Sequence, residues 1–256
     1  MTTRVIIPWR GGCSRREANL RRVVSWWEQH HPEWALTVGE YPEEAGGWRK
    51  GMAVLAAGLP VAVADVVIVS DADVICEQVE LAVEVVSGKR RHRGTPTQPL
   101  WAMPHRDVYR LNESATQMVC DGTWWPAQVT TTRELRPYVA RSYAGFAGGG
   151  LVVLRGQLFN EVPMDPRFVG WGQEDHSWAL ALSMLGGAPW RGHGVLWHLW
   201  HPQAARLYPG VGSDAGLHLW QRYRAASTPP EMLSLIGEAR QEIRRLRQQE
   251  CHTGRG

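Results

Sequence analysis

Two aspartates stand directly after an apolar run near residue 70. The run covers residues 66–69 and is followed, after Ser70, by Asp71 and Asp73. A continuous apolar run is typical of a parallel strand buried on both faces, and ligands of open α/β sheets bind at the carboxyl ends of such strands. Carboxylates two residues apart lie on one side of the chain, where they suit a hard divalent cation that also binds diphosphate oxygens. We therefore predict a metal site; the alternative is a solvated Asp-x-Asp turn.

A second acidic pair, Glu174 and Asp175, follows the Gly-Trp-Gly sequence at 170–172. Glycine lets the backbone approach a ligand closely, and the spacing of apolar residues predicts a helix over 174–185. The alternative is that both acids only complement the dipole of this helix. That alternative leaves the glycines unexplained, so we expect the pair to belong to a functional site.

Two histidines, His198 and His201, stand three residues apart downstream of both acidic pairs. Histidine can complete a metal site that is otherwise made of carboxylates, which favours manganese over a pure magnesium site. A lone histidine is more often a structural residue. The pair predicts that at least one of the two is a metal ligand.

The elements that must position these residues begin with an alternation of strands and helices. Ser14 and Glu17 have the spacing of a capping box, and a glycine-rich turn over 145–150 leads into a further strand. The alternation predicts a parallel, doubly wound sheet. The expected strands lie at 4–8, 34–38 and 65–70, and the expected helices at 14–29 and 48–57.

The tail differs from the rest of the chain. Thr228 can cap a helix whose first turn contains two prolines. Apolar residues then recur at helical spacing among Arg, Glu and Gln. We expect this stripe to pack on its own domain; the alternative is a homodimer seam through the C-terminal helix. The stripe consists of Met232, Ile236, Ala239, Ile243 and Leu246.

Composition sets the broad class of the protein. The 256 residues are 44% apolar and 21% charged, with a net charge of +3 that does not by itself indicate nucleic-acid binding. The four cysteines form no CxxC pair and are expected to be reduced thiols of a cytosolic protein. No window has the roughly 18 apolar residues of a membrane span, and the first strand begins too early for a signal peptide. We expect a cytoplasmic protein of bacterial or viral origin, with no membrane partner.

Four motifs occur in an order that resembles GT-A glycosyltransferases, and more narrowly glycosyltransferase family 2 and the galactosyltransferase C-terminal module. They lie at 5–10, 70–73, 148–150 and 170–175. The resemblance implies an α/β fold of GT-A type, with a Rossmann-like, mostly parallel central sheet flanked by helices and a C-terminal helical extension. It implies a GT-A domain over 1–226, with a nucleotide-binding half (1–88) and an acceptor and catalytic half (98–202), and an amphipathic helix over 228–250.

The resemblance also implies roles for matching residues. Asp73 and His198 would be metal ligands, with Asp71 and His201 as further candidates, for Mn²⁺ or Mg²⁺. Asp175 would be the base of an inverting reaction and Glu174 would contact a sugar. An inverting transfer needs such a carboxylate to take the proton of the acceptor hydroxyl. Residues that would bind the donor are Pro8, Arg10, Asp71, Asp73, Gly149, Gly150 and Trp171.

The implied activity is metal-dependent transfer of a hexose from a nucleotide diphosphate sugar, with a UDP-sugar as the expected donor. The acceptor hydroxyl could belong to a glycan, a protein or a modified DNA base. The chain departs from inverting galactosyltransferases at Gly12, where they carry a second arginine, and at His176 and Ser177, where they carry further acids. Alternatives are a sugar nucleotidyltransferase and a non-catalytic carbohydrate-binding protein of the same fold.

Overall fold

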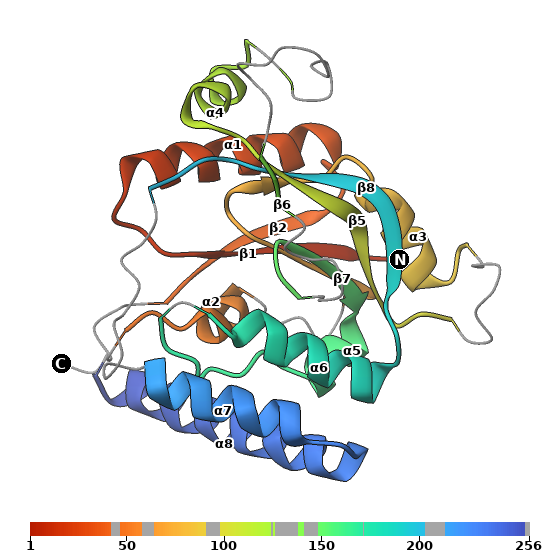
Figure 1. Ribbon diagram of the computed structural model, residues 1–256, viewed down its shortest axis with the longest axis vertical. Helices are drawn as coiled ribbons and strands as arrows, with labels where there is room; N and C mark the ends of the chain where they lie inside the picture. Colours follow the sequence, from red (N-terminus) through yellow and green to blue (C-terminus); the bar gives the residue numbers. More distant parts are fainter. Residues whose placement is uncertain are drawn as a thin grey trace.

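The computed structural model describes residues 1–41, 47–57, 64–90, 98–123, 125, 138–140, 148–170, 172–202 and 213–253. Within these ranges an eight-stranded sheet lies between two layers of helices (Figure 1). The strands are β1 (Thr3–Trp9), β2 (Ala35–Glu40), β3 (Val66–Ser70), β4 (Val74–Ile75), β5 (Trp101–Arg110), β6 (Tyr138–Ala140), β7 (Leu151–Arg155) and β8 (Trp190–His198).

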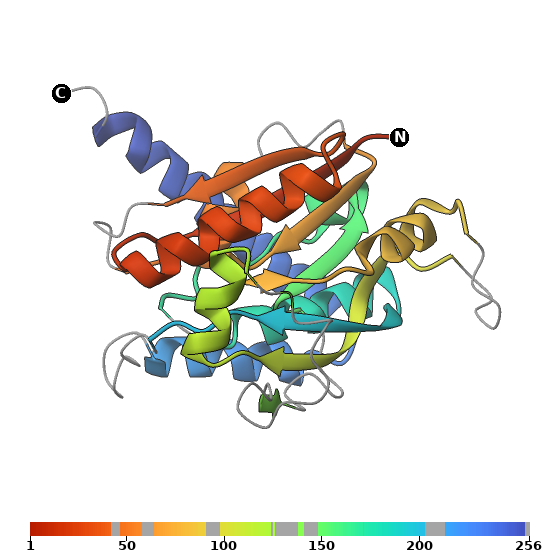
Figure 2. The same ribbon diagram turned by 90° about the horizontal axis from the view of Figure 1, so that it is seen from above.

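The helices cover both faces of the sheet. One face carries α1 (Ser14–His30), α3 (Val79–Ser87) and α4 (Glu113–Cys120). The other carries α2 (Lys50–Ala57), α5 (Gly156–Glu161) and α6 (Glu174–Gly186), with α7 (Ser213–Ala225) and α8 (Pro229–Thr253) packed outside them. Seen from above, α1 and α4 lie on the near side of the sheet and α7 on the far side (Figure 2).

The sheet order is β2-β1-β3-β7-β5-β8-β4, with β6 paired to β5. β1 pairs parallel with both β2 and β3, and β5 pairs parallel with β8. The remaining pairings are antiparallel, so five of the eight strands in the described ranges run in one direction. The α/β class predicted from the sequence is confirmed. The half of the sheet that contains β7, β5, β8 and β4 has both parallel and antiparallel pairings.

The central strands are apolar because both of their faces are covered. All five residues of β3 are buried, and its four apolar residues alternate between two hydrophobic clusters. Ile68 belongs to the cluster under α1, and Val67 belongs to the cluster under α6. A strand buried in this way holds its carboxyl end, and therefore Asp71, in a fixed place at the edge of the sheet.

The apolar stripe of the tail packs on its own chain, as expected. Met232 and Ile236 join the cluster under α6, while Ile243 and Leu246 contact Tyr41 and α2 residues. Thr228 and Glu231 form the reciprocal bonds of a capping box. None of the described helices is long and apolar enough to cross a membrane.

The capping box predicted at the start of α1 is wrong. The N-cap residue is Cys13, whose carbonyl oxygen accepts the Glu17 N–H at 3.0 Å, and its side chain makes no capping bond. Ser14 lies inside the helix, one position too late to cap it. Sequence spacing alone does not fix a cap to a single residue, because helix ends vary by one or two positions.

Candidate metal and catalytic site

Strand pairing brings Asp73 to the two histidines. β4 pairs antiparallel with the end of β8, so that Val74 lies opposite His198. The Leu199 N–H donates to the Asp73 carbonyl at 2.8 Å. Because only residues 71–73 separate β3 from β4, the end of β8 lies within a short chain length of the end of β3. Residues 125 positions apart in sequence therefore become neighbours.

Asp73, His198 and His201 have the spacing of a metal site. One ligand atom from each lies within 4.8 Å of the others. The His201 Nε2 is 3.0 Å from the Asp73 Oδ2, and the His198 Nε2 is 4.0 Å from the Oδ1. This cluster contains three of the four metal ligands expected from the sequence, and one carboxylate with two imidazoles is a donor set for a divalent transition metal.

Hydrogen bonds set the orientation of both imidazole rings. The Nδ1 of His198 lies 2.9 Å from the Leu199 carbonyl oxygen, and the Nδ1 of His201 lies 2.8 Å from that of Pro202. A carbonyl oxygen only accepts, so each Nδ1 carries a proton and each Nε2 faces Asp73. This arrangement, with the far nitrogen bonded to a backbone carbonyl, is the usual one for histidines that bind metals.

The charge of Asp73 also fits a cation. Burial alone would raise the pKa of Asp73, but the charges of His198 and His201 and a hydrogen bond from His201 lower it to about 2. Burial lowers the pKa of His201, and the bond to Asp73 outweighs this and raises it. Asp73 is therefore ionised at neutral pH, which a metal ligand must be.

A buried lysine joins the two acidic pairs. Lys50, at the start of α2, is 6% exposed. Its Nζ lies 2.7 Å from the Asp71 Oδ1 and 2.8 Å from the Asp175 Oδ1. The side chains of Asp71 and Asp175 keep 28% and 26% exposure, so solvent reaches the carboxylates and hardly reaches the lysine.

Sequence reasoning missed Lys50. It begins a helix of apolar residues, and such a helix predicts core packing and no chemistry. One signal was present, because the chain contains only two lysines, Lys50 and Lys89, among 28 basic residues. A lysine at the start of an otherwise buried helix needs a carboxylate partner, and the partners come from distant strands and helices.

Three carboxyl groups interact with this one ammonium, two of them by direct contact and Glu174 through its charge. Burial raises the pKa of Asp175 to about 7; Lys50 opposes the shift, and the charges of Glu174 and Asp71 add to it. Burial also raises the pKa of Glu174. Burial lowers the pKa of Lys50, but the carboxylates outweigh it and raise that pKa well above its ordinary value. Lys50 therefore stays charged, and Asp175 changes protonation near neutral pH.

The backbone around Asp175 is tightly constrained. A Cβ on Gly148 would lie 2.2 Å from the Asp175 carbonyl oxygen, and Gly148 has a φ of +110°, so only glycine fits there. Gln173, which precedes α6, has a φ of 77° and is the only non-glycine residue of positive φ in the described ranges. The Glu174 Oε2 is buried and makes no hydrogen bond with the described residues. Such an orphaned carboxylate oxygen indicates a bonding position that a ligand can fill.

Of the remaining predicted residues, all but one lie at the sheet edge formed by the carboxyl ends of β1 and β3, and one lies outside the described residues. The Asp71 N–H donates to the Gly150 carbonyl at 2.8 Å, and the Gly150 N–H donates to the Asp71 Oδ2 at 3.2 Å. Gly149 precedes this contact. Pro8 and Arg10 stand at the carboxyl end of β1, which is the same edge as the end of β3. Trp171 lies outside the described residues.

No family model and no curated protein sequence matches the chain. Among solved structures it is similar to a mutant of Drosophila β-1,4-galactosyltransferase 7 in complex with manganese, UDP-Gal and xylobiose, at 11% identity, 84% coverage of this chain, 79% of that chain and a TM-score of 0.47. It is also similar to glucosyl-3-phosphoglycerate synthase from Mycobacterium tuberculosis with Mn²⁺, UDP and glucosyl-3-phosphoglycerate (17%, 92%, 80% and 0.42). A third is GalNAc-T7 with UDP, GalNAc and Mn²⁺ (16%, 87%, 47% and 0.46).

These solved structures are glycosyltransferases, which is the class of protein that the sequence motifs predicted. They are complexes with manganese and either UDP or UDP-Gal. Because every one of these TM-scores lies below 0.5, we take the function from the residues of this chain.

Proposed function

We propose that this protein is a metal-dependent glycosyltransferase that moves a sugar from a nucleotide diphosphate sugar to an acceptor hydroxyl. The observation that carries the proposal is the cluster of Asp73, His198 and His201, which lies at the same sheet edge as the acid–lysine cluster of Asp71, Lys50 and Asp175. Asp71 and Asp73 are two residues apart, so the two clusters adjoin. One cluster can hold a metal, and the other offers a carboxyl group that titrates near neutral pH.

We propose Asp73, His198 and His201 as the residues that hold Mn²⁺ or Mg²⁺, with Asp71, two positions before Asp73, as a further candidate. A bound divalent cation would neutralise charge on the diphosphate leaving group. The ionised Asp73 and the Nε2 atoms of both histidines, which face Asp73, support this role. Pro8, Arg10, Gly149, Gly150 and Trp171 are proposed to line the donor pocket.

Asp175 is proposed as the general base of an inverting transfer. Its carboxylate takes the proton of the acceptor hydroxyl while that oxygen attacks the anomeric carbon. The bond from this carbon to the diphosphate breaks on the opposite side, and the diphosphate leaves with the electron pair. A base is most effective with a pKa near the working pH, and the pKa of Asp175 is about 7.

Two neighbours of Asp175 are given supporting roles. Lys50 holds one carboxylate oxygen at 2.8 Å and so fixes the direction of the other. Glu174, with a buried oxygen that lacks a bonding partner among the described residues, is proposed to accept a hydrogen bond from a sugar hydroxyl. We propose a UDP-sugar as donor, in line with the sequence resemblance.

A donor screen tests the proposal. Thermal shifts would be measured with Mn²⁺ and diphosphate sugars of uridine, guanosine and thymidine, followed by donor hydrolysis with the best of them. We expect one nucleotide to stabilise the protein only when Mn²⁺ is present, and to be hydrolysed slowly. Release of pyrophosphate from a nucleoside triphosphate would identify a nucleotidyltransferase instead. Sugar binding without any turnover would identify a carbohydrate-binding protein.

A further inference from the structure

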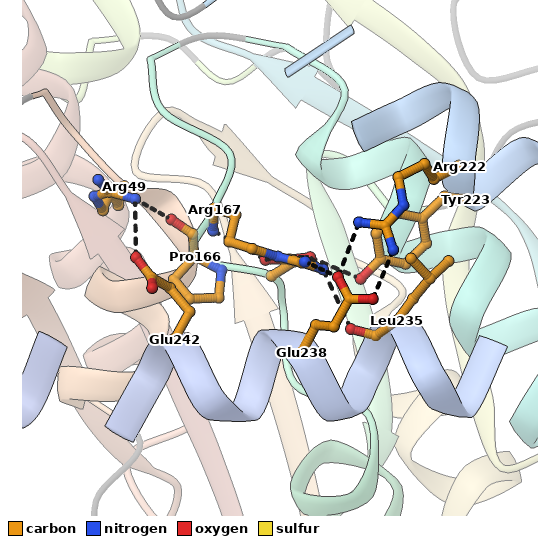
Figure 3. Close-up of polar contacts among 9 residues, drawn as sticks. Arg49, Pro166, Arg167, Arg222, Tyr223, Leu235, Glu238 and Glu242 are labelled. Carbon is orange, nitrogen blue, oxygen red and sulfur yellow. Dashed lines mark hydrogen bonds and ion pairs between the residues drawn. The ribbon is translucent and has the colours of Figure 1, made fainter. Parts of the chain in front are cut away.

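The C-terminal helix α8 is bonded to two of the three chain segments that carry the acid–lysine cluster, those of Lys50 and Asp175. Arg49, which precedes Lys50, lies 4.0 Å from the Glu242 Oε1 of α8. Arg167, at the start of the segment that leads to Asp175, is hydrogen-bonded to Glu238 of the same helix. Figure 3 shows the two acids on one side of α8, each facing its arginine.

The two segments are also bonded to each other. The Arg49 Nη1 donates to the Pro166 carbonyl oxygen at 2.7 Å, and the Gly170 N–H donates to the Trp48 carbonyl oxygen at 2.8 Å. A Cβ on Gly51 would lie 2.9 Å from the Met164 carbonyl oxygen, so this turn of α2 packs directly on the segment. A displacement of residues 164–170 would therefore displace Lys50 as well.

A charge network around the buried Asp165 holds this attachment in place. Asp165 is 4% exposed and accepts hydrogen bonds from the Arg167 guanidinium at 2.6 to 3.1 Å and from the Tyr223 hydroxyl at 2.9 Å. Arg167 also donates to the Leu235 carbonyl oxygen at 3.2 Å. A guanidinium bonded to a carboxylate through two nitrogens has one favoured orientation, which aims its remaining nitrogen at Glu238 (Figure 3).

Glu238 is the point at which three elements meet. Arg222 of α7 donates to both of its oxygens, at 2.8 and 2.6 Å, while Arg167 binds it from the segment before Asp175. An isolated surface ion pair contributes little. Here, loss of the Glu238 charge would leave two guanidinium groups facing each other across a neutral side chain.

We propose that Glu238 is a positioning residue, through which α8 sets the separation of Lys50 and Asp175. The proposal rests on the proposed function, because it assigns the C-terminal helix a part in holding the proposed base. α8 then does more than bury its apolar stripe. It fixes the chain segments on both sides of the acid–lysine cluster.

The test compares Glu238→Gln with Arg240→Gln in the full-length protein. Arg240 lies on the same helix and donates to the Glu161 carbonyl oxygen at 2.7 Å, so the control removes a bond from α8 to a different segment. The first readout is hydrogen exchange of the Gly170 amide, which reports the bond to Trp48. We expect exchange about tenfold faster in Glu238→Gln and unchanged in Arg240→Gln, because opening would be local.

The second readout separates positioning from general loss of structure. With the donor found in the screen, Glu238→Gln should lower kcat about tenfold, while the Kd of the donor stays within about twofold. If Glu238→Gln fails to fold, Arg222→Gln removes one of the two partners of Glu238 and should give smaller changes of the same kind.

Two results would overturn the proposal. One is equal change of Gly170 exchange in both variants, which would make α8 a packing element only; the other is no change in either. Hydrogen exchange needs no substrate, so it also decides the matter for a chain that turns over no nucleotide sugar. Failure of the proposed function is thus distinguished from failure of the positioning role proposed for Glu238.

Discussion

Asp73 is the residue that connects the strand end to both histidines. We expect Asp73→Ala to abolish metal-dependent turnover, because the variant loses the only carboxylate of the described three-residue cluster. Titration calorimetry with Mn²⁺ and donor hydrolysis would measure the loss. His218→Ala, on α7 and outside that cluster, is the matched control. Full activity of Asp73→Ala at ordinary manganese concentrations would show that the cation binds elsewhere.

Asp175 is expected to act on the rate and hardly on donor affinity. Asp175→Asn keeps the shape of the side chain and removes its ability to take a proton. Transfer should fall by about 10²–10⁴, which is the usual range for a general base, while the Kd of the donor stays nearly constant. Rate and affinity would be measured separately, by single turnover and by calorimetry. A collapse of donor affinity would make Asp175 a binding residue.

Lys50 should set the pH dependence of the reaction. The base must be deprotonated to act, so the rate should rise with pH through the pKa of Asp175, about 7. Lys50→Met removes the nearest positive charge and raises this pKa, because an opposite charge favours ionisation. We expect the acid limb of the kcat profile to move to higher pH, so that part of the lost activity returns above pH 8. The other lysine supplies the control, as Lys89→Met should leave the profile unchanged.

Most of the candidate site could be predicted residue by residue, and its assembly could not. The residue type and the place after a strand or at the start of a helix were enough to predict the four acids, Asp71, Asp73, Glu174 and Asp175. Lys50 does not, because its role depends on two partners brought in by the fold. A buried charge is detectable only once its partners are known.

At the scale of the element, substitutions on α8 can test whether its apolar stripe packs on its own chain. Ile236 is fully buried in the cluster under α6, so Ile236→Ala should lower the free energy of unfolding by about 2–5 kcal/mol. Leu233, on the same helix and 54% exposed, is the control, and Leu233→Ala should change stability by less than about 0.5 kcal/mol. Urea denaturation at two protein concentrations would measure both. A midpoint that moves with concentration would indicate that the stripe joins two chains.

The elements of the first half of the chain were predictable because consecutive strands and helices there pack on each other. β1, β2 and β3 form one parallel unit, and the apolar runs of β1 and β3 are continuous. β5 was not predictable. Its pairing with β8 shifts register on both sides of His105, and such irregularities break the alternation of side chains from which a strand is recognised. Its partners β7 and β8 also follow it by dozens of residues.

At the scale of the whole molecule, the candidate metal site connects the end of β3 to the far edge of the sheet. An ion that binds only the folded protein stabilises it by about 2.7 kcal/mol at a concentration of 100 Kd. We therefore expect Mn²⁺ to raise the Tm in a concentration-dependent way, and a chelator to reverse the rise. The Asp73→Ala variant should show no rise. An equal rise in that variant would contradict the assignment of these ligands.

Gln173 carries the one left-handed backbone among the described non-glycine residues, directly before the two catalytic candidates. Glycine would adopt this conformation without the steric cost of a side chain. A screen for heat-tolerant variants should therefore select glycine at this position. The same replacement would loosen the peptide that aims Glu174 and Asp175, so the tolerant protein should be a slower one. Natural selection for turnover would then account for a residue that lowers the resistance of the protein to heat.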